Sequence, residues 1–205
     1  MKSIILINGA RFYENNNDGH GLEHIQEVMA NLTKLMIMAE KDLGIKLNKE
    51  LMYTAALYHD TGSSIDRKTH HLESAKIVKS EEYLKEIFSE DEINMIALMC
   101  EEHRSSRKEP CTNILSALLN DADSMTTFDK MIERCYKYNL KHNEDKSYEA
   151  VFDEVYKHLV EKFGRNGYQQ FRTKYANSLM NVEERYEVLD NKELFKIKYN
   201  KIIKR

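Results

Sequence analysis

Apolar positions recur every three to four residues along most of the chain, which is the pattern of amphipathic helices rather than of strands. The clearest run extends from Leu22 to Met38, and Gly44 supplies a stop signal for that helix. The same spacing predicts a second helix from about Asn48 to His59 and a third from about His70 through Val78. No segment reads as a convincing sheet strand, so the pattern predicts an all-α fold.

Capping residues predict where the later helices begin. Ser89 is followed three residues later by Glu92, which forms the sequence pattern of a capping box. The expected helices are Ser89 to about His103, a helix capped by Thr112 and running through Leu119, Ser147 to Gly164, and a last helical stretch after Gly167.

The composition agrees with a helical fold. The 205 residues include one proline and seven glycines, fewer than an average chain would have. A barrel or sandwich of many short strands needs turn residues at regular spacing, so this shortage argues against both. The length is that of one domain, with room for an appendage.

Charge and cysteine content narrow the class of protein. The 31 basic residues are balanced by 34 acidic ones, so the chain has no strong basic field for general nucleic-acid binding. The apolar runs are too short to span a bilayer. The three cysteines, Cys100, Cys111 and Cys135, are odd in number and form no CxxC pair, which favours a reduced, cytoplasmic protein. A homo-oligomer stays open.

Histidines and aspartates gather near the predicted helix ends in the first half of the chain. One helix carries His24, another ends in His59-Asp60, and a fifth contains Asp121 and Asp123. His70 begins the third helix and His103 ends the fourth. His20 precedes the first of these helices and is expected to cap it or to support the site. Alone, each histidine would be read as a hydrogen-bonded core residue; the combination points to a metal site.

These residues resemble the pattern of the HD-domain family of metal-dependent phosphohydrolases: a His, an adjacent His-Asp at a helix end, and a distant Asp. The segments that carry the resemblance are Gly-Leu-Glu-His24-Ile-Gln-Glu-Val, Ala-Leu-Tyr-His59-Asp60-Thr-Gly and Asp-Ala-Asp123-Ser-Met. Asp121 and Asp123 point away from each other on a helix, and the family pattern favours Asp123. Asp121 is then expected to be structural.

The resemblance implies a single HD-domain helical bundle. It places the metal-binding core in residues 1–140 and a helical C-terminal extension, packed on the same domain, in residues 141–205. It also implies that His24, His59, Asp60 and Asp123 hold one divalent metal. Two imidazoles and two carboxylates suit Mn, Fe, Co, Ni or Zn, and Mg is compatible.

The resemblance implies one of two roles for His70 and His103. They are either ligands of a second metal, or general acids and phosphate contacts beside the first metal. We favour the second reading, with one metal, and keep a second metal open. Asp60 is expected to orient the attacking water as well as to hold the metal. Arg104, Arg67 and Lys68 are the candidate substrate-binding cations.

The function expected from the resemblance is hydrolysis of a phosphate ester or anhydride by a metal-activated water. The substrate would be a small phosphorylated metabolite, most plausibly a nucleotide. Two alternatives remain: a non-catalytic ligand-sensing or partner-binding protein with a structural metal, and an HD-fold di-iron oxygenase. The oxygenase would need His70 and His103 as additional ligands.

Overall fold

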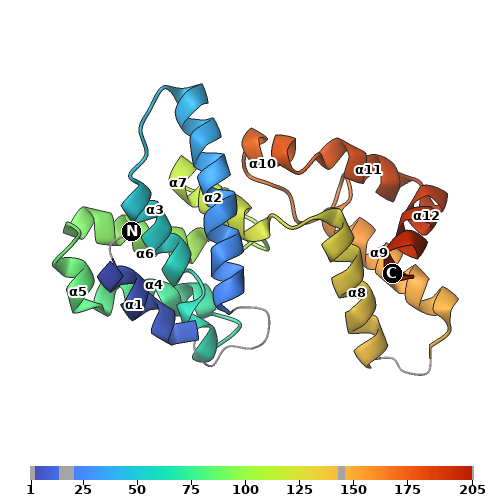
Figure 1. The fold of residues 1–205 in the computed structure, drawn as a ribbon, viewed down its shortest axis with the longest axis horizontal. Coiled ribbons are helices and arrows are strands. Elements are labelled where there is room, and N and C mark those ends of the chain that lie inside the picture. The colour runs from blue at the N-terminus through green and yellow to red at the C-terminus, as the bar shows by residue number, and fades with distance from the viewer. Residues whose placement is uncertain (1–2, 14–20, 143–145, 205) are drawn as a thin grey trace. The chain divides into compact units, whose positions relative to one another are not determined.

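The computed structural model describes residues 3–13, 21–142 and 146–204, and these residues are helical with no strand among them (Figure 1). The all-α prediction is therefore confirmed. His20 lies outside the described residues. Among the helices of the described part, none is long and apolar enough to cross a membrane.

The chain divides into two compact units. The first comprises Met1–Met125 together with Phe171–Ala176, and the second comprises Thr126–Gln170 and Asn177–Arg205. The division thus falls after residue 125, not after residue 140 as expected. The reason is the next helix, whose Met131 and Ile132 are buried in the core of the second unit.

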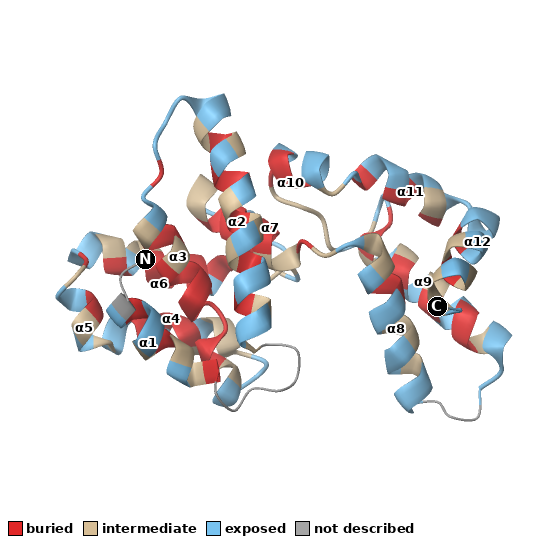
Figure 2. Cartoon of the chain, viewed as in Figure 1, coloured by how far each residue is buried: buried red, intermediate tan, exposed pale blue. Residues whose placement is uncertain are grey.

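The helices of the first unit pack around α6 (Glu90–Glu102), which lies against α3 (Lys49–Tyr58), α4 (His70–Ser80) and α7 (Ile114–Ser124). The longest helix, α2 (Leu22–Leu43), packs against α7 and α3. Buried positions line their facing sides (Figure 2). The remaining elements are α1 (Ser3–Ala10), α5 (Glu82–Lys85) and two short 3-10 turns, η1 (Arg11–Tyr13) and η2 (Thr61–Ser64).

Most of the capping and stop residues predicted from the sequence begin or end helices in the structure. Gly44 ends α2 in the left-handed conformation, with φ of 66°. The Asn48 side chain accepts a hydrogen bond from Leu51 N at the start of α3. Ser89 and Glu92 form both halves of the capping box of α6. These helices therefore begin and end where local chemistry supplies partners for their free backbone groups.

The expected cap of α7 is wrong by one residue. The side chain of Asn113, and not that of Thr112, accepts from Ser116 N. The Thr112 hydroxyl instead donates to the buried carboxylate of Glu102. Because Thr112 is engaged in this tertiary hydrogen bond, its neighbour Asn113 caps the helix.

The second unit contains four helices that the structure describes in full: α8 (Phe128–His142), α9 (Tyr148–Phe163), α11 (Val182–Asp190) and α12 (Lys192–Ile203). Its core is rich in aromatic rings, with the Phe152 ring 5.7 Å from that of Phe195 and 5.2 Å from that of Tyr199. The helix α10 (Lys174–Leu179) spans the boundary between the units. Sequence patterns predict α9 and the helical stretch after Gly167, but they do not predict α1, α5 or α8.

Asp121 attaches the returning segment 171–176 to the rest of the first unit. Its fully buried carboxylate accepts from Arg172 N at 2.6 Å, from Thr173 N at 2.8 Å and from the Thr173 hydroxyl at 2.7 Å. Burial raises the pKa of Asp121 to about 6, although these hydrogen bonds act in the opposite direction. The structural role expected for Asp121 is thus observed as three contacts.

We expect Asp121→Ala to lower the free energy of unfolding by about 2–4 kcal/mol, because three donors lose their buried acceptor. Asp121→Asn keeps one acceptor oxygen and removes a charge that burial disfavours, so its loss should be smaller. Denaturant unfolding of the two variants measures the difference. Equal losses of stability in the two variants would mean that the three hydrogen bonds are not the cause of the destabilisation.

Candidate metal centre

Four histidines and two aspartates from five helices meet in the first unit, although they span residues 24–123 of the sequence. Each of them lies in the first or last turn of a helix or directly after one. The six are His24 in the first turn of α2, His59 and Asp60 directly after α3, His70 at the start of α4, His103 directly after α6, and Asp123 near the end of α7.

Asp60 lies between two pairs of histidines. Its Oδ2 is 3.5 Å from Nε2 of His59 and 3.9 Å from Nε2 of His24. Its Oδ1 is 3.2 Å from Nε2 of His70 and 3.4 Å from Nε2 of His103. The residue is 2% exposed, so its charge is compensated within this cluster rather than by water.

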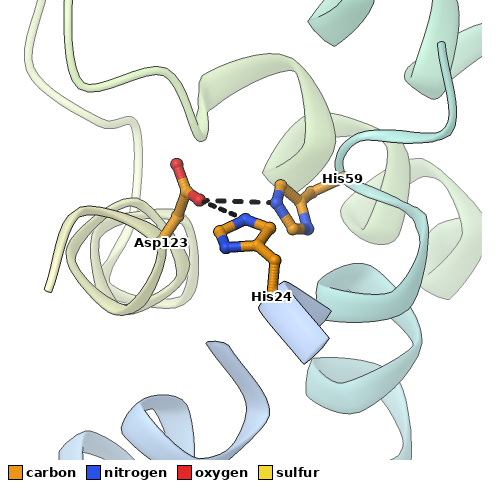
Figure 3. A group of neighbouring side chains, drawn as sticks. All are labelled: His24, His59 and Asp123. Atoms are coloured by element: carbon orange, nitrogen blue, oxygen red, sulfur yellow. Dashed lines mark ion pairs between the residues drawn. The ribbon is translucent and has the colours of Figure 1, made fainter. Parts of the chain in front are cut away.

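Asp123 joins the first of these pairs. Its Oδ1 lies 3.1 Å from Nε2 of His24 and 3.5 Å from Nε2 of His59, and Figure 3 shows the three side chains pointing toward one another. Burial alone would raise the pKa of Asp123, but its interactions with the two histidines outweigh burial and hold that pKa well below its usual value. The carboxylate is therefore anionic at neutral pH.

Three of the histidines present the same ring nitrogen to the cluster for the same reason. Nδ1 of His59, His70 and His103 lies 2.7, 2.9 and 2.6 Å from the backbone carbonyl of the residue three positions earlier. A carbonyl only accepts, so each Nδ1 carries the hydrogen and each Nε2 is the nitrogen available as a ligand. For His59 and His103 the accepting carbonyls, of Ala56 and Cys100, belong to the last turns of α3 and α6, where helix carbonyls lack helical partners.

The charge of the cluster favours a cation. Burial lowers the pKa of His59, but the charge of Asp60 and the contacts with Asp123 and Ala56 outweigh burial and raise it to about 9. A proton on His59 Nε2 would stabilise the two carboxylates, and a divalent metal would do so more strongly at the same place. His70 behaves differently, because its burial lowers its pKa and keeps the ring neutral.

The donor set fits a transition metal. The ligand atoms of His24, His59 and Asp123 all lie within 4.8 Å of one another, and so do those of His59, Asp60 and His103. The 3.5 Å spacing between His59 Nε2 and each carboxylate is longer than a strong hydrogen bond. Imidazole nitrogens with carboxylate oxygens suit Mn, Fe, Co, Ni and Zn.

A close approach at Gly62 sets the position of His70. Gly62 N donates to the Ser74 hydroxyl at 2.9 Å, which holds η2 against α4. A Cβ on Gly62 would lie 2.7 Å from Glu73 Cβ and from Ser74 N, so no larger residue fits there without moving α4. The turn after His59-Asp60 is thereby held next to the helix that begins with His70.

Two residues that the sequence analysis does not anticipate hold the backbone around His103. Asn120 Nδ2 donates to the carbonyls of Glu102 and Arg104, both at 3.0 Å. The Glu102 carboxylate accepts from Thr112 N at 3.0 Å and pairs with Arg107 at 3.3 Å. No sequence motif marks either residue, because both act on backbone groups or loop residues that are brought near only by folding.

The predicted substrate-binding cations lie at different positions around the cluster. Arg104 donates from Nη1 to the Lys68 carbonyl at 2.8 Å and is partly buried. Arg67 and Lys68 have exposed side chains. The Arg67 carbonyl accepts from Nδ1 of the cluster residue His70, and the Lys68 carbonyl accepts from Arg104. The Arg104 side chain is thus fixed by a hydrogen bond, and Arg104 directly follows the cluster residue His103.

Comparison with known proteins adds one match. A family model described as the HD domain matches residues 21–127, which include all six cluster residues. No curated protein and no solved structure matches the chain.

We expect metal binding to release protons at pH 7. In the metal-free protein His59, with its pKa at about 9, is protonated, and it must lose that proton before Nε2 can bind a metal. Calorimetric titration of EDTA-treated protein with Mn²⁺, in buffers of different ionisation enthalpy, should give about one released proton per chain. Binding heats that do not depend on the buffer would contradict this expectation.

Proposed function

The chain belongs to the HD-domain family, and we propose that it is a phosphohydrolase that cleaves a phosphate ester or anhydride of a small metabolite, a nucleotide. HD domains bind divalent metals and form a superfamily of metal-dependent hydrolases. The observation that carries the proposal is the position of Asp60, whose two oxygens face two different pairs of histidine Nε2 atoms.

We assign two cation positions to this centre. His24, His59, Asp60 and Asp123 would hold the first ion, as the family resemblance implies. Asp60, His70 and His103 would hold the second. The Nε2 atoms of His70 and His103 lie beside Oδ1 of Asp60, just as the Nε2 atoms of His59 and His24 lie beside Oδ2. The sequence favours a single ion, with His70 and His103 as general acids or phosphate contacts. The contacts of Asp60 instead support two ions.

A bound divalent cation would neutralise phosphate charge and lower the pKa of a water molecule. The protein's own residues supply the rest. Asp60 and Asp123 provide the negative charge that holds cations, and the carbonyl contacts of the histidines fix the direction of each Nε2. Arg104, fixed by the Lys68 carbonyl, provides positive charge that remains for a phosphate oxygen.

The activity test is a metal-reconstituted screen across nucleoside mono-, di- and triphosphates and cyclic nucleotides. We expect hydrolysis by the wild-type chain and a loss of more than about 1,000-fold for Asp60→Ala, because removing the shared carboxylate removes the metal. Asp91→Ala, an exposed aspartate on α6, is the matched control and should retain activity. Normal hydrolysis by a metal-free Asp60→Ala protein would rule out the mechanism, and a flat screen would favour the non-catalytic alternative.

The number of ions is tested separately by elemental analysis after dialysis against each metal. We expect about two ions per wild-type chain at saturation, about one for His70→Ala and none for Asp60→Ala. Retention of both ions by His70→Ala would contradict the second position. Asp91→Ala again serves as the control, because it changes an aspartate outside the cluster.

The same six side chains also support one other reaction class, the di-iron oxygenase, because that alternative requires His70 and His103 at the metal centre. Loading with Fe²⁺ under nitrogen and then admitting oxygen distinguishes the two. Substrate turnover that requires O₂ and two irons per chain would favour the oxygenase. Hydrolysis of phosphate compounds under nitrogen would favour the hydrolase.

A further inference from the structure

Asn31 connects helix α2 to the end of helix α7, at the place where α7 carries Asp123. The half-buried side chain of Asn31 donates from Nδ2 to the backbone carbonyls of Ala122 and Met125, both at 3.2 Å. These two carbonyls lie on either side of Asp123 in the chain, and α7 ends at Ser124. Carbonyls at the end of a helix lack helical partners, so the Asn31 amide completes this helix end.

Asn31 lies on the same face of α2 as His24. Seven residues make almost two full turns of an α-helix, so the two side chains leave α2 in nearly the same direction. His24 Nε2 reaches Asp123 Oδ1 at 3.1 Å, and Asn31 reaches the backbone on both sides of Asp123. One face of α2 therefore contacts both the carboxylate of Asp123 and the backbone that carries it.

Asn120 repeats this arrangement between α7 and α6. Its Nδ2 donates to the carbonyls of Glu102 and Arg104, which flank His103 at the end of α6. Asn120 is 1% exposed, so water does not compete for its amide. Asn120 and Asp123 are three residues apart on α7, a spacing that makes them neighbours on the helix surface.

The two asparagines thus link three helices that carry candidate ligands. The helix α2, which carries His24, holds the end of α7, and α7 in turn holds the end of α6. A metal ligand has to be held within about 0.5 Å of its productive position. Fixing the backbone on both sides of Asp123 and of His103 restricts the movement of each side chain in this way.

We propose that Asn31 and Asn120 are positioning residues of the metal centre, and that each acts on a different ion. Asn31 positions Asp123 for the first ion, and Asn120 positions His103 for the second. The inference rests on the two cation positions assigned under the proposed function. It does not depend on which reaction the loaded centre carries out.

The test is calorimetric titration of EDTA-treated protein with Mn²⁺. In the otherwise wild-type chain, Asn120→Ala should weaken the second ion about tenfold and change the affinity of the first by less than about twofold. The first ion is followed alone in the His70→Ala chain, which lacks the second position. In that chain, Asn31→Ala should weaken the remaining ion about tenfold, whereas Asn120→Ala should change its affinity by less than about twofold.

Asn139→Ala is the matched control. Asn139 Nδ2 also donates to a backbone carbonyl, that of Cys135 at 3.0 Å, but within α8 of the second unit. This variant should bind both ions as the wild type does. Circular dichroism checks that each variant folds. Asn31→Ser and Asn120→Ser also lack the amide donors but fill more space than alanine, and they replace an alanine variant that does not fold.

A merely structural role would weaken both ions together, so equal weakening of the two ions by either variant would overturn the inference. Unchanged affinities would do the same. A wild-type chain that binds a single ion would remove the role of Asn120, and one that binds no Mn²⁺ would remove both roles. If the ions bind as expected but no phosphate compound is hydrolysed, the proposed reaction fails and the positioning roles stand.

Discussion

The negative charge of Asp60 and Asp123 is the constraint on which the centre depends. Asp60 is almost wholly buried, and its oxygens have histidine nitrogens as neighbours on both sides. A buried carboxylate without compensation costs several kcal/mol, so the cluster requires positive charge at its middle. Protons supply it through the raised pKa of His59, and divalent cations would supply more of it in the same volume. Burial of the two carboxylates therefore makes the site unfavourable without positive charge, and for the same reason it favours binding of a metal cation.

The helical frame makes this arrangement possible because helix ends have free backbone carbonyls. His59 and His103 follow directly after α3 and α6, and each uses Nδ1 to satisfy a carbonyl of the last turn. The same hydrogen bond that completes the helix end also directs Nε2 toward the carboxylates. For His59 and His103, helix termination and ligand orientation are thus one interaction, which explains why these two candidate ligands lie directly after helices.

The loop after α6 links the cluster to its surroundings. Asn120 holds the backbone on both sides of His103, and Glu102 holds Thr112 and Arg107. One polar network thereby positions His103, a candidate ligand, together with Arg107 and Thr112 of the loop.

The helical class and the limits of α2, α6 and α9 follow from the sequence alone, because periodicity and caps act over a few residues. The histidines and aspartates that meet are identified from the sequence through the resemblance to the HD-domain pattern. The sequence did not determine that α8 belongs to the second unit, that Asn113 caps α7, or that Asp60 faces two histidine pairs at once. Each of these depends on partners far away in the chain. A side chain's spacing along a helix sets its direction, but only packing decides which atoms it faces.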